Sequence, residues 1–150
     1  MNKAIITFLI SMVPVIELRG SIPFGFANGV NPVFCFVLSV IGNLIPVPFI
    51  ILFIRKIFEW AKKKGNFLEK PVLWLERKAE RKKGNVLKYE FFGLMVLVAI
   101  PLPGTGAWTG ALVAAMLDMQ LKRALPSIIF GVIIAGILVT LATVGVIAII

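Results

Sequence analysis

The sequence contains no histidine, only one cysteine and few acidic residues. Without histidine the chain lacks the commonest metal ligand and general base, and the Ser-His and Cys-His catalytic pairs are excluded. Cys35 alone can form neither an internal disulfide nor a cysteine-based metal site. No other pair of nucleophile and base is recognisable, so we expect neither an enzyme nor a protein that needs a cofactor.

Polar stretches are also scarce, and this indicates a membrane protein. Hydrophobic residues make up 59% of the 150 residues, and the mean hydropathy is +1.00. Uncharged runs cover residues 20–54, 91–117 and 124–150, each longer than the roughly 20 residues that cross a bilayer. The first 16 residues resemble a signal peptide, but no small-x-small cleavage site precedes Glu17, so we expect them to remain in the protein. We predict a multi-pass protein of the cell (plasma) membrane, in contact with membrane lipids.

The net charge of +9 is concentrated in one place, because 12 of the 16 Lys and Arg residues lie between Arg55 and Lys88. Basic residues next to spanning segments usually mark the cytoplasmic side, so we expect the loop of about residues 59–88 to be cytoplasmic. Pro71 to Gly84 are predicted to form an amphipathic helix on the membrane surface; a solvated loop that only fixes topology is the alternative. No nucleic-acid-binding motif surrounds these charges, so nucleic acid is not an expected partner.

The basic loop divides a single transmembrane domain into two repeats of similar layout, about residues 1–58 and 89–150. Each repeat has a short apolar segment, an interruption with proline and glycine, and a long apolar helix. The short segments, residues 4–13 and 91–100, would be about 15 Å long as helices, half the thickness of the hydrocarbon. We predict an all-α membrane fold in which two re-entrant helical hairpins and two full-span helices form an inverted repeat. A Pro-kinked spanning helix in each half is the alternative.

Capping residues predict where the long helices begin. Asn31 and Pro32 are typical of an N-cap followed by proline at the first helical position, opening a helix that runs to about residue 58. Pro46 and Pro48 should kink this helix. Asp118 is expected to cap the last helix at the membrane surface.

The two interruptions are expected to meet near mid-membrane, since non-helical backbone at that depth is tolerated only where it is buried in protein or lines a watered cavity. Glu17 and Arg19 are the only charged residues between Lys3 and Arg55, which makes them the first candidates for a binding site. Being two positions apart, they would share one side of an extended tip and face one cavity. A structural ion pair between them is the alternative.

The residue types at both tips suit an anion. The Arg19 guanidinium matches phosphate or carboxylate, and a half-helix beginning near Ser21 would aim its positive end at the same place. At the second tip two glycines permit a sharp turn, Thr105 is expected to cap the following half-helix, and Trp108 adds an indole donor. The candidate substrate-binding residues are Glu17, Arg19, Ser21, Gly104, Thr105, Gly106 and Trp108. Glu17 is also the candidate for carrying a coupling proton.

Two motifs carry a resemblance to a known family. They are Pro14-x-x-Glu17-Leu-Arg19-Gly20-x-Ile-Pro23 and Pro101-Leu-Pro103-Gly104-Thr105-Gly106-Ala-Trp108-Thr-Gly110. Together they resemble the small multi-drug export family, over essentially the whole chain. That family looks like a relative of the DedA (VTT-like) superfamily, whose members combine re-entrant hairpins with inverted repeats and in several cases are implicated in moving lipid phosphates across bacterial membranes. Thr105 stands where DedA proteins often carry an acidic residue.

We therefore predict a small, DedA-like transporter that moves an anionic amphiphile or lipid phosphate. One alternative is an exporter of cationic drugs in which Glu17 is the binding acid, and another is a channel or a scaffold. A homodimer is expected, because so small a chain has little room to enclose a pathway. Gly131, Ala135 and Gly136 would give the last helix a small-residue face for the second copy.

Overall fold

The structure is a computed structural model that describes residues 2–63 and 86–150, and within these ranges the regular secondary structure is all helical. The helices are α1 (Lys3–Met12), α2 (Glu17–Ala27), α3 (Pro32–Leu44), α4 (Pro46–Lys63), α6 (Val86–Ala99), α7 (Ala107–Met116) and α8 (Leu121–Ile149). The surface helix expected between Pro71 and Gly84 lies outside the described residues.

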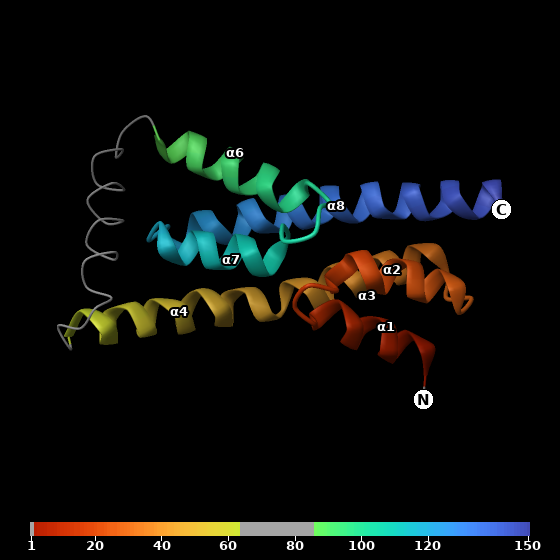
Figure 1. Ribbon diagram of the computed structural model, residues 1–150, viewed down its shortest axis with the longest axis horizontal. Helices are drawn as coiled ribbons and strands as arrows, with labels where there is room; N and C mark the ends of the chain where they lie inside the picture. Colours follow the sequence, from red (N-terminus) through yellow and green to blue (C-terminus); the bar gives the residue numbers. More distant parts are fainter. Residues whose placement is uncertain (1, 64–85) are drawn as a thin grey trace.

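Two long apolar rods set the length of the molecule. One is formed by α3 and α4 over Pro32–Trp60, and the other is α8; each has 29 residues, with hydropathies of 2.5 and 2.8. They run in opposite directions along the long axis (Figure 1). At 1.5 Å per residue, either rod is long enough to cross the hydrocarbon of a bilayer. The described chain is thus all-helical with two candidate membrane-spanning helices.

The predicted helix starts have different outcomes. Asn31 caps α3 as expected, with its side chain accepting from the Val33 N–H at 3.0 Å and Pro32 as the first helical residue. The expected cap of α8 by Asp118 is wrong. The chain turns tightly between α7 and α8, and Asp118 adopts a left-handed φ of 53° there, which Asp tolerates. The N-cap position of α8 falls to Gln120, which makes no side-chain capping bond.

The first rod is broken where its prolines lie. Helix α3 ends at Leu44 and α4 begins at Pro46, with Ile45 between them. Pro46 and Pro48 have no N–H, so neither can donate the helical bond to the carbonyl four residues earlier, at Gly42 and Leu44. The helical hydrogen bonding is interrupted there, although Ile45 itself keeps helical φ and ψ of −56° and −46° and donates to the Ile41 carbonyl. The predicted kink stays a prediction.

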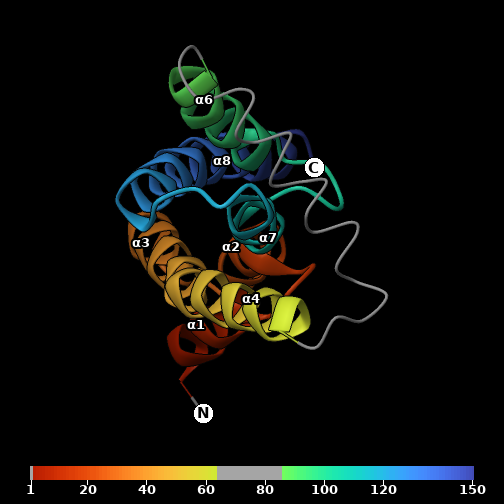
Figure 2. The same ribbon diagram turned by 90° about the vertical axis from the view of Figure 1, so that its left-hand side faces the viewer.

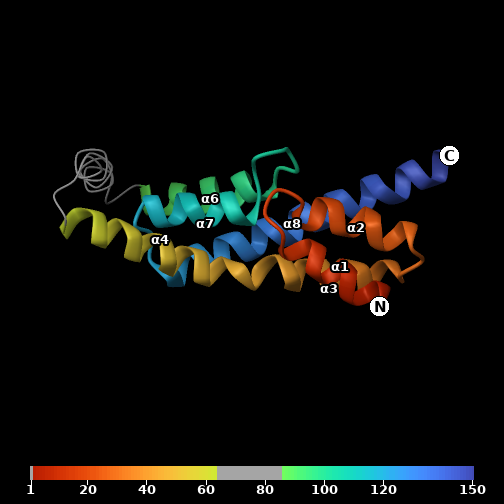
Figure 3. The ribbon, with the colours of Figure 1, turned by 60° about the horizontal axis from the view of Figure 1, so that its bottom comes forward.

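The four short helices form two helical hairpins. Helices α1 and α2 pack side by side and turn at residues 13–16, whereas α6 and α7 turn at residues 100–106. The first hairpin extends from the end where α8 finishes, the second from the end where α8 begins, and the two turns meet between them (Figures 1 and 3). Viewed along the long axis, α7 lies between α4 on one side and α6 with α8 on the other (Figure 2).

The small residues of α8 pack against helices of the same chain. A Cβ on Gly131 would lie 2.7 Å from the Val98 side chain of α6, and one on Gly136 would lie 2.7 Å from the Phe36 ring of α3. Ala135 is 3% exposed. The face predicted to receive a second copy is therefore covered by α3 and α6, because α8 has to approach both closely along its first half.

Candidate functional site at the junction of the hairpin tips

Glu17 and Arg19 lie on a helix and not in an extended tip, which corrects the sequence-based prediction. The chain reverses before them, with left-handed φ values of 76° at Val15 and 49° at Glu17, so that α2 begins at Glu17. The half-helix expected to start near Ser21 therefore starts four residues earlier. Helical residues two apart point to different faces. The described residues contain no Glu17–Arg19 ion pair within 4.0 Å, and their one such pair joins Arg55 to Asp118.

The Glu17 carboxylate binds the start of α7. Its Oε1 accepts from the backbone N–H of Trp108 at 3.1 Å, and the side chain is only 3% exposed. Trp108 is the second residue of α7, so Glu17 does from the other hairpin what an N-cap side chain does locally. The N-cap position itself is Gly106, with φ 132° and ψ −168°, where an added Cβ would collide with the Glu17 carboxylate. Gly106 thus makes room for the acid.

Thr105 hydrogen-bonds to carbonyls that follow the end of α6 and does not cap the start of α7. Its predicted capping role is therefore also wrong. Its hydroxyl lies 2.6 Å from the carbonyl oxygen of Ile100 and 2.8 Å from that of Leu102. The same hydroxyl accepts from Arg19 Nη2 at 2.7 Å. The acid Glu17 occupies the position near the α7 amides that a Thr105 cap would have needed.

Arg19 binds the other side of the second tip. Its Nη1 donates to the carbonyl of Leu102, and its Nη2 donates to the carbonyl of Ile100 at 3.1 Å. These carbonyls follow the end of α6, where a helix leaves its last acceptors unpaired and its dipole is negative. A basic side chain of the first hairpin thus closes the end of one helix in the second.

Two further predicted residues complete the joint. The Trp108 indole Nε1 donates to the carbonyl of Met12, the last residue of α1, at 3.3 Å. Gly104 forms the turn with a φ of 83°, and its carbonyl accepts from the Thr109 hydroxyl at 2.9 Å. The structure therefore brings Glu17, Arg19, Thr105, Gly106 and Trp108 together and places Gly104 in the adjoining turn.

Ser21 lies elsewhere, one helical turn along α2 from the junction. Its hydroxyl donates to that of Ser39 on α3 at 2.7 Å, and both side chains are buried. Asn43, one turn beyond Ser39, lies beside Glu17 and is fully buried. Sequence reasoning missed Asn43; the available signal was a carboxamide inside a long uncharged run.

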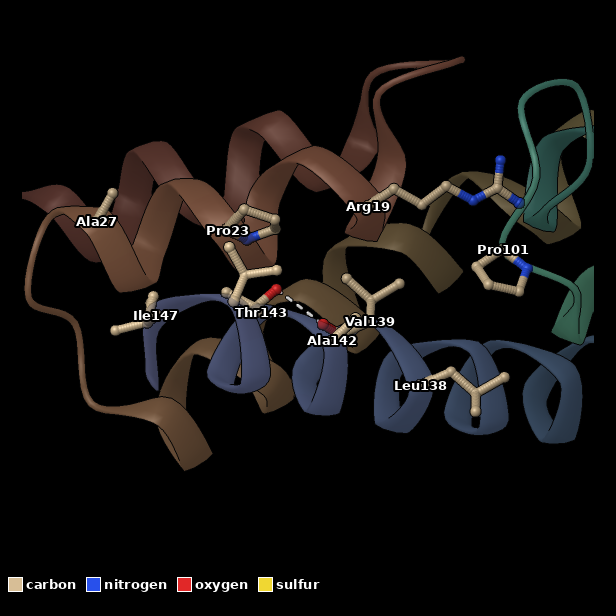
Figure 4. A pocket seen from close by; sticks show the side chains of 10 residues that line it. Arg19, Pro23, Ala27, Pro101, Leu138, Val139, Ala142, Thr143 and Ile147 are labelled. Carbon is tan, nitrogen blue, oxygen red and sulfur yellow. Dashed lines mark hydrogen bonds between the residues drawn. The ribbon is translucent and has the colours of Figure 1, made fainter. Parts of the chain in front are cut away.

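An open groove adjoins the junction. It has a volume of about 580 Å³ and runs between α2 and the C-terminal half of α8, with the Arg19 side chain at one end, extended toward the second tip (Figure 4). Among its described lining residues Arg19 alone is charged, while the Thr143 hydroxyl is engaged by the Val139 carbonyl at 2.7 Å. The others are apolar: Pro23, Ala27, Pro101, Leu138, Val139, Ala142, Val146 and Ile147. Sequence reasoning missed the groove because the α8 stripe resembles any lipid-facing surface.

Two helical hairpins are joined by a buried acid and a partly buried arginine, beside two helices long and apolar enough to span a bilayer. These features indicate a small helical membrane protein. The chain belongs to the family described as "Putative small multi-drug export protein", whose sequence profile matches residues 17–138. That span begins at Glu17, directly after the first turn, and includes the second turn and the first half of α8. It confirms the resemblance seen in the motifs. No match to the chain was found among curated proteins or among solved structures.

Proposed function

We propose that this protein is a small membrane transporter that moves an anionic amphiphile, such as a lipid phosphate. The family description supports a transport role. The observation that carries the choice of substrate is the sign of the charge at the groove. Arg19 is the charged residue that lines it, whereas Glu17 is 3% exposed and bound to the start of α7.

The groove suits a molecule with a tail and a charged head. Its apolar length between α2 and α8 accommodates a hydrocarbon chain, and Arg19 stands where the head would lie. The guanidinium has five N–H donors, and the three bonds to the second tip leave donors for an anion. A phosphate that draws Arg19 toward itself would also weaken its bonds to the Ile100 and Leu102 carbonyls, which follow α6. Binding is in this way linked to release of the tip.

We propose that α1–α2 and α6–α7 are re-entrant hairpins and that the two halves form an inverted repeat. Support comes from their entry from opposite ends and from their turns meeting midway along the two rods (Figure 1). The same arrangement is what the resemblance to the DedA superfamily implies. The basic loop then lies on the cytoplasmic side of the plasma membrane, at the end where α4 finishes and α8 begins.

Glu17 is proposed to carry the coupling proton. An ionised carboxylate is the better partner for the positive end of α7, so a proton on Glu17 would weaken the bond to the Trp108 N–H. Proton uptake would then loosen the contact between Glu17 and α7, and substrate binding would loosen the contacts between Arg19 and the second tip. We further propose a homodimer, whose interface must avoid the covered face of α8 that contains Gly131.

The family description equally supports a second candidate, an exporter of cationic drugs. In that case Glu17 would bind the cation, and it would have to leave the Trp108 N–H to do so. The two candidates predict opposite preferences for the charge of an amphiphile of fixed tail length.

Equilibrium binding of dodecyl phosphate and dodecyltrimethylammonium to the purified protein in nanodiscs tests the proposal. The phosphate should bind more tightly, and Arg19→Gln should lose about 1.5 to 3 kcal/mol of that binding, with partial recovery in Arg19→Lys. Ala142→Trp, which fills the groove without altering a charge, should also abolish binding. Ala148→Trp, on an exposed part of α8 outside the groove, is the matched control.

The opposite pattern would favour drug export. Tighter binding of the ammonium compound, lost in Glu17→Gln and unaffected by Ala142→Trp, would show that the anion proposal is wrong. Monodisperse elution of each variant confirms that the protein is folded in every comparison.

A further inference from the structure

Helices α2 and α3 face each other through a buried ladder of small and polar residues. On each helix the members are four positions apart, so they share one face. The facing pairs are Gly25 with Cys35, Ser21 with Ser39 and Glu17 with Asn43. The first pair is in tight contact and the second is hydrogen-bonded at 2.7 Å. The ladder thus fixes the third pair, at the junction of the tips.

Asn43 is the unsatisfied member of this ladder. It is 0% exposed, and within the described residues neither its Oδ1 nor its Nδ2 makes a hydrogen bond of normal geometry. A buried carboxamide without partners is costly, and such groups in native proteins usually have a role that explains them. The polar group beside it is the Glu17 carboxylate, whose Oε1 accepts from the Trp108 N–H.

Few other charges act on Glu17. Arg19 is the charged neighbour on its own helix, and α7 presents the positive end of its dipole. Cys35, the titratable residue of α3, is two helical turns away, and α1 has only Lys3, at its far end. The charged parts of α4, α6 and α8 lie away from Glu17, toward the end of the molecule that contains the turn between α7 and α8 (Figure 1).

We propose that Asn43 is a positioning residue that allows Glu17 to take up and release a proton inside the membrane. A carboxamide has both donors and an acceptor. Its Nδ2 donates to Oε2 when Glu17 is ionised, and its Oδ1, after the amide turns over, accepts from the O–H when Oε2 carries the proton. The proton comes from water and returns to water, and no other bond is made or broken. The inference deepens the proposed function, because the proton has a use only in a transporter.

The test follows the proton directly and uses no amphiphile. In nanodiscs, infrared difference spectroscopy across a pH series detects the carboxylic-acid C=O band of Glu17, assigned by its loss in Glu17→Gln. Asn43→Leu keeps the branched shape of the side chain but removes the donor to the carboxylate. Its titration midpoint should move to higher pH by about one unit or more, as expected for a lost hydrogen bond to a charged group.

Asn43→Ser should shift the midpoint less, since a hydroxyl can still donate over a shorter reach, and this variant carries the test if Asn43→Leu does not fold. The Ser21→Ala/Ser39→Ala double variant is the matched control. It removes buried polar groups one rung away and should leave the midpoint within a few tenths of a unit.

Three outcomes would overturn the inference. They are the absence of a titrating Glu17 band, a midpoint shift in the Ser21→Ala/Ser39→Ala variant equal to that of Asn43→Leu, and a band that responds to Na⁺ and not to pH. Binding of dodecyl phosphate, measured on the same samples, separates this result from the proposed function. A shifted midpoint together with absent phosphate binding would reject the anion proposal and leave the role of Asn43 intact.

Discussion

The charges of α2 are matched to opposite ends of two helices. Glu17 binds amides at the start of α7, where the helix dipole is positive, and Arg19 binds carbonyls beyond the end of α6, where it is negative. Because Glu17 is buried and Arg19 is partly buried, these contacts are screened less than surface pairs would be. Each charge therefore holds one side of the second tip. Protonation of Glu17, or withdrawal of the Arg19 guanidinium from its carbonyl partners, would loosen the same joint.

The space for Glu17 can be tested at Gly106. Gly106→Ala places a Cβ against the carboxylate and also strains a backbone conformation that is essentially restricted to glycine. We expect this substitution to destabilise the protein by about 1 to 3 kcal/mol more than Gly104→Ala, measured by thermal unfolding in detergent. Gly104 has a left-handed φ of 83° but open space around it, so its substitution carries backbone strain alone. Equal losses in the two variants would show that the contact with Glu17 has no energetic weight.

At the scale of elements, the glycines of α8 differ in what surrounds them. Gly131 lies where α8 meets α6, with the Met95 carbonyl 2.8 Å from the position of an added Cβ, whereas Gly145 has nothing within 4 Å. Alanine is the better helix former by roughly 1 kcal/mol. Propensity therefore favours both substitutions, and packing opposes only the one at Gly131.

We expect Gly131→Ala to lower the thermal stability by about 1 to 3 kcal/mol, through overpacking against α6, and Gly145→Ala to leave it unchanged or raise it. Thermal unfolding of the two variants in the same detergent measures the difference. Light scattering should show the same oligomeric state for both, because Gly131 contacts α6 of its own chain. Dissociation caused by Gly131→Ala alone would place this residue in an interface between copies.

For the whole molecule, the arrangement of the chain ends determines the topology. The start of α1 and the end of α8 lie toward one end of the structure, and the turn between α7 and α8 lies toward the other (Figure 1). In a bilayer spanned by the two rods, residues 2 and 150 would be on one side and residue 120 on the other. With the basic loop on the cytoplasmic side, as proposed above, we expect residue 120 inside.

Thiol labelling of single cysteines in a Cys35→Ser background tests this topology. Asn2→Cys and Ile150→Cys should react with an impermeant reagent added to intact cells, whereas Gln120→Cys should react only after permeabilisation. Cys35 is fully buried and bonded within the α2–α3 ladder, so serine is the mildest replacement. Reaction of Asn2→Cys from the cytoplasm alone would contradict the re-entrant arrangement of the first hairpin.

Much of the helical arrangement can be predicted from the amino-acid sequence alone. Uncharged runs and the capping of α3 by Asn31 depend on local composition, and α1, α2 and α6 end close to a proline or glycine. The importance of Glu17 and Arg19 also follows locally, because ionisable groups in an apolar run are costly wherever the chain places them. Local physics of this kind predicts most of the helices and the interruptions between them, and it marks Glu17 and Arg19 as candidates.

What each residue does was decided only by the tertiary structure. The sequence predicted Thr105 as the cap of α7, but in the structure Glu17 has this role. The reason is that the first hairpin brings a stronger acceptor to the same amides. Asn43 and the groove along α8 involve partners far apart in sequence. A carboxamide in an uncharged run marks Asn43 as unusual but does not reveal its neighbour, and no local pattern marks the groove. Gly131 and Gly136 look like a surface for a second copy until α6 and α3 are seen to cover them. Contacts between distant segments depend on how the helices pack, and residue spacing along one helix does not contain that information.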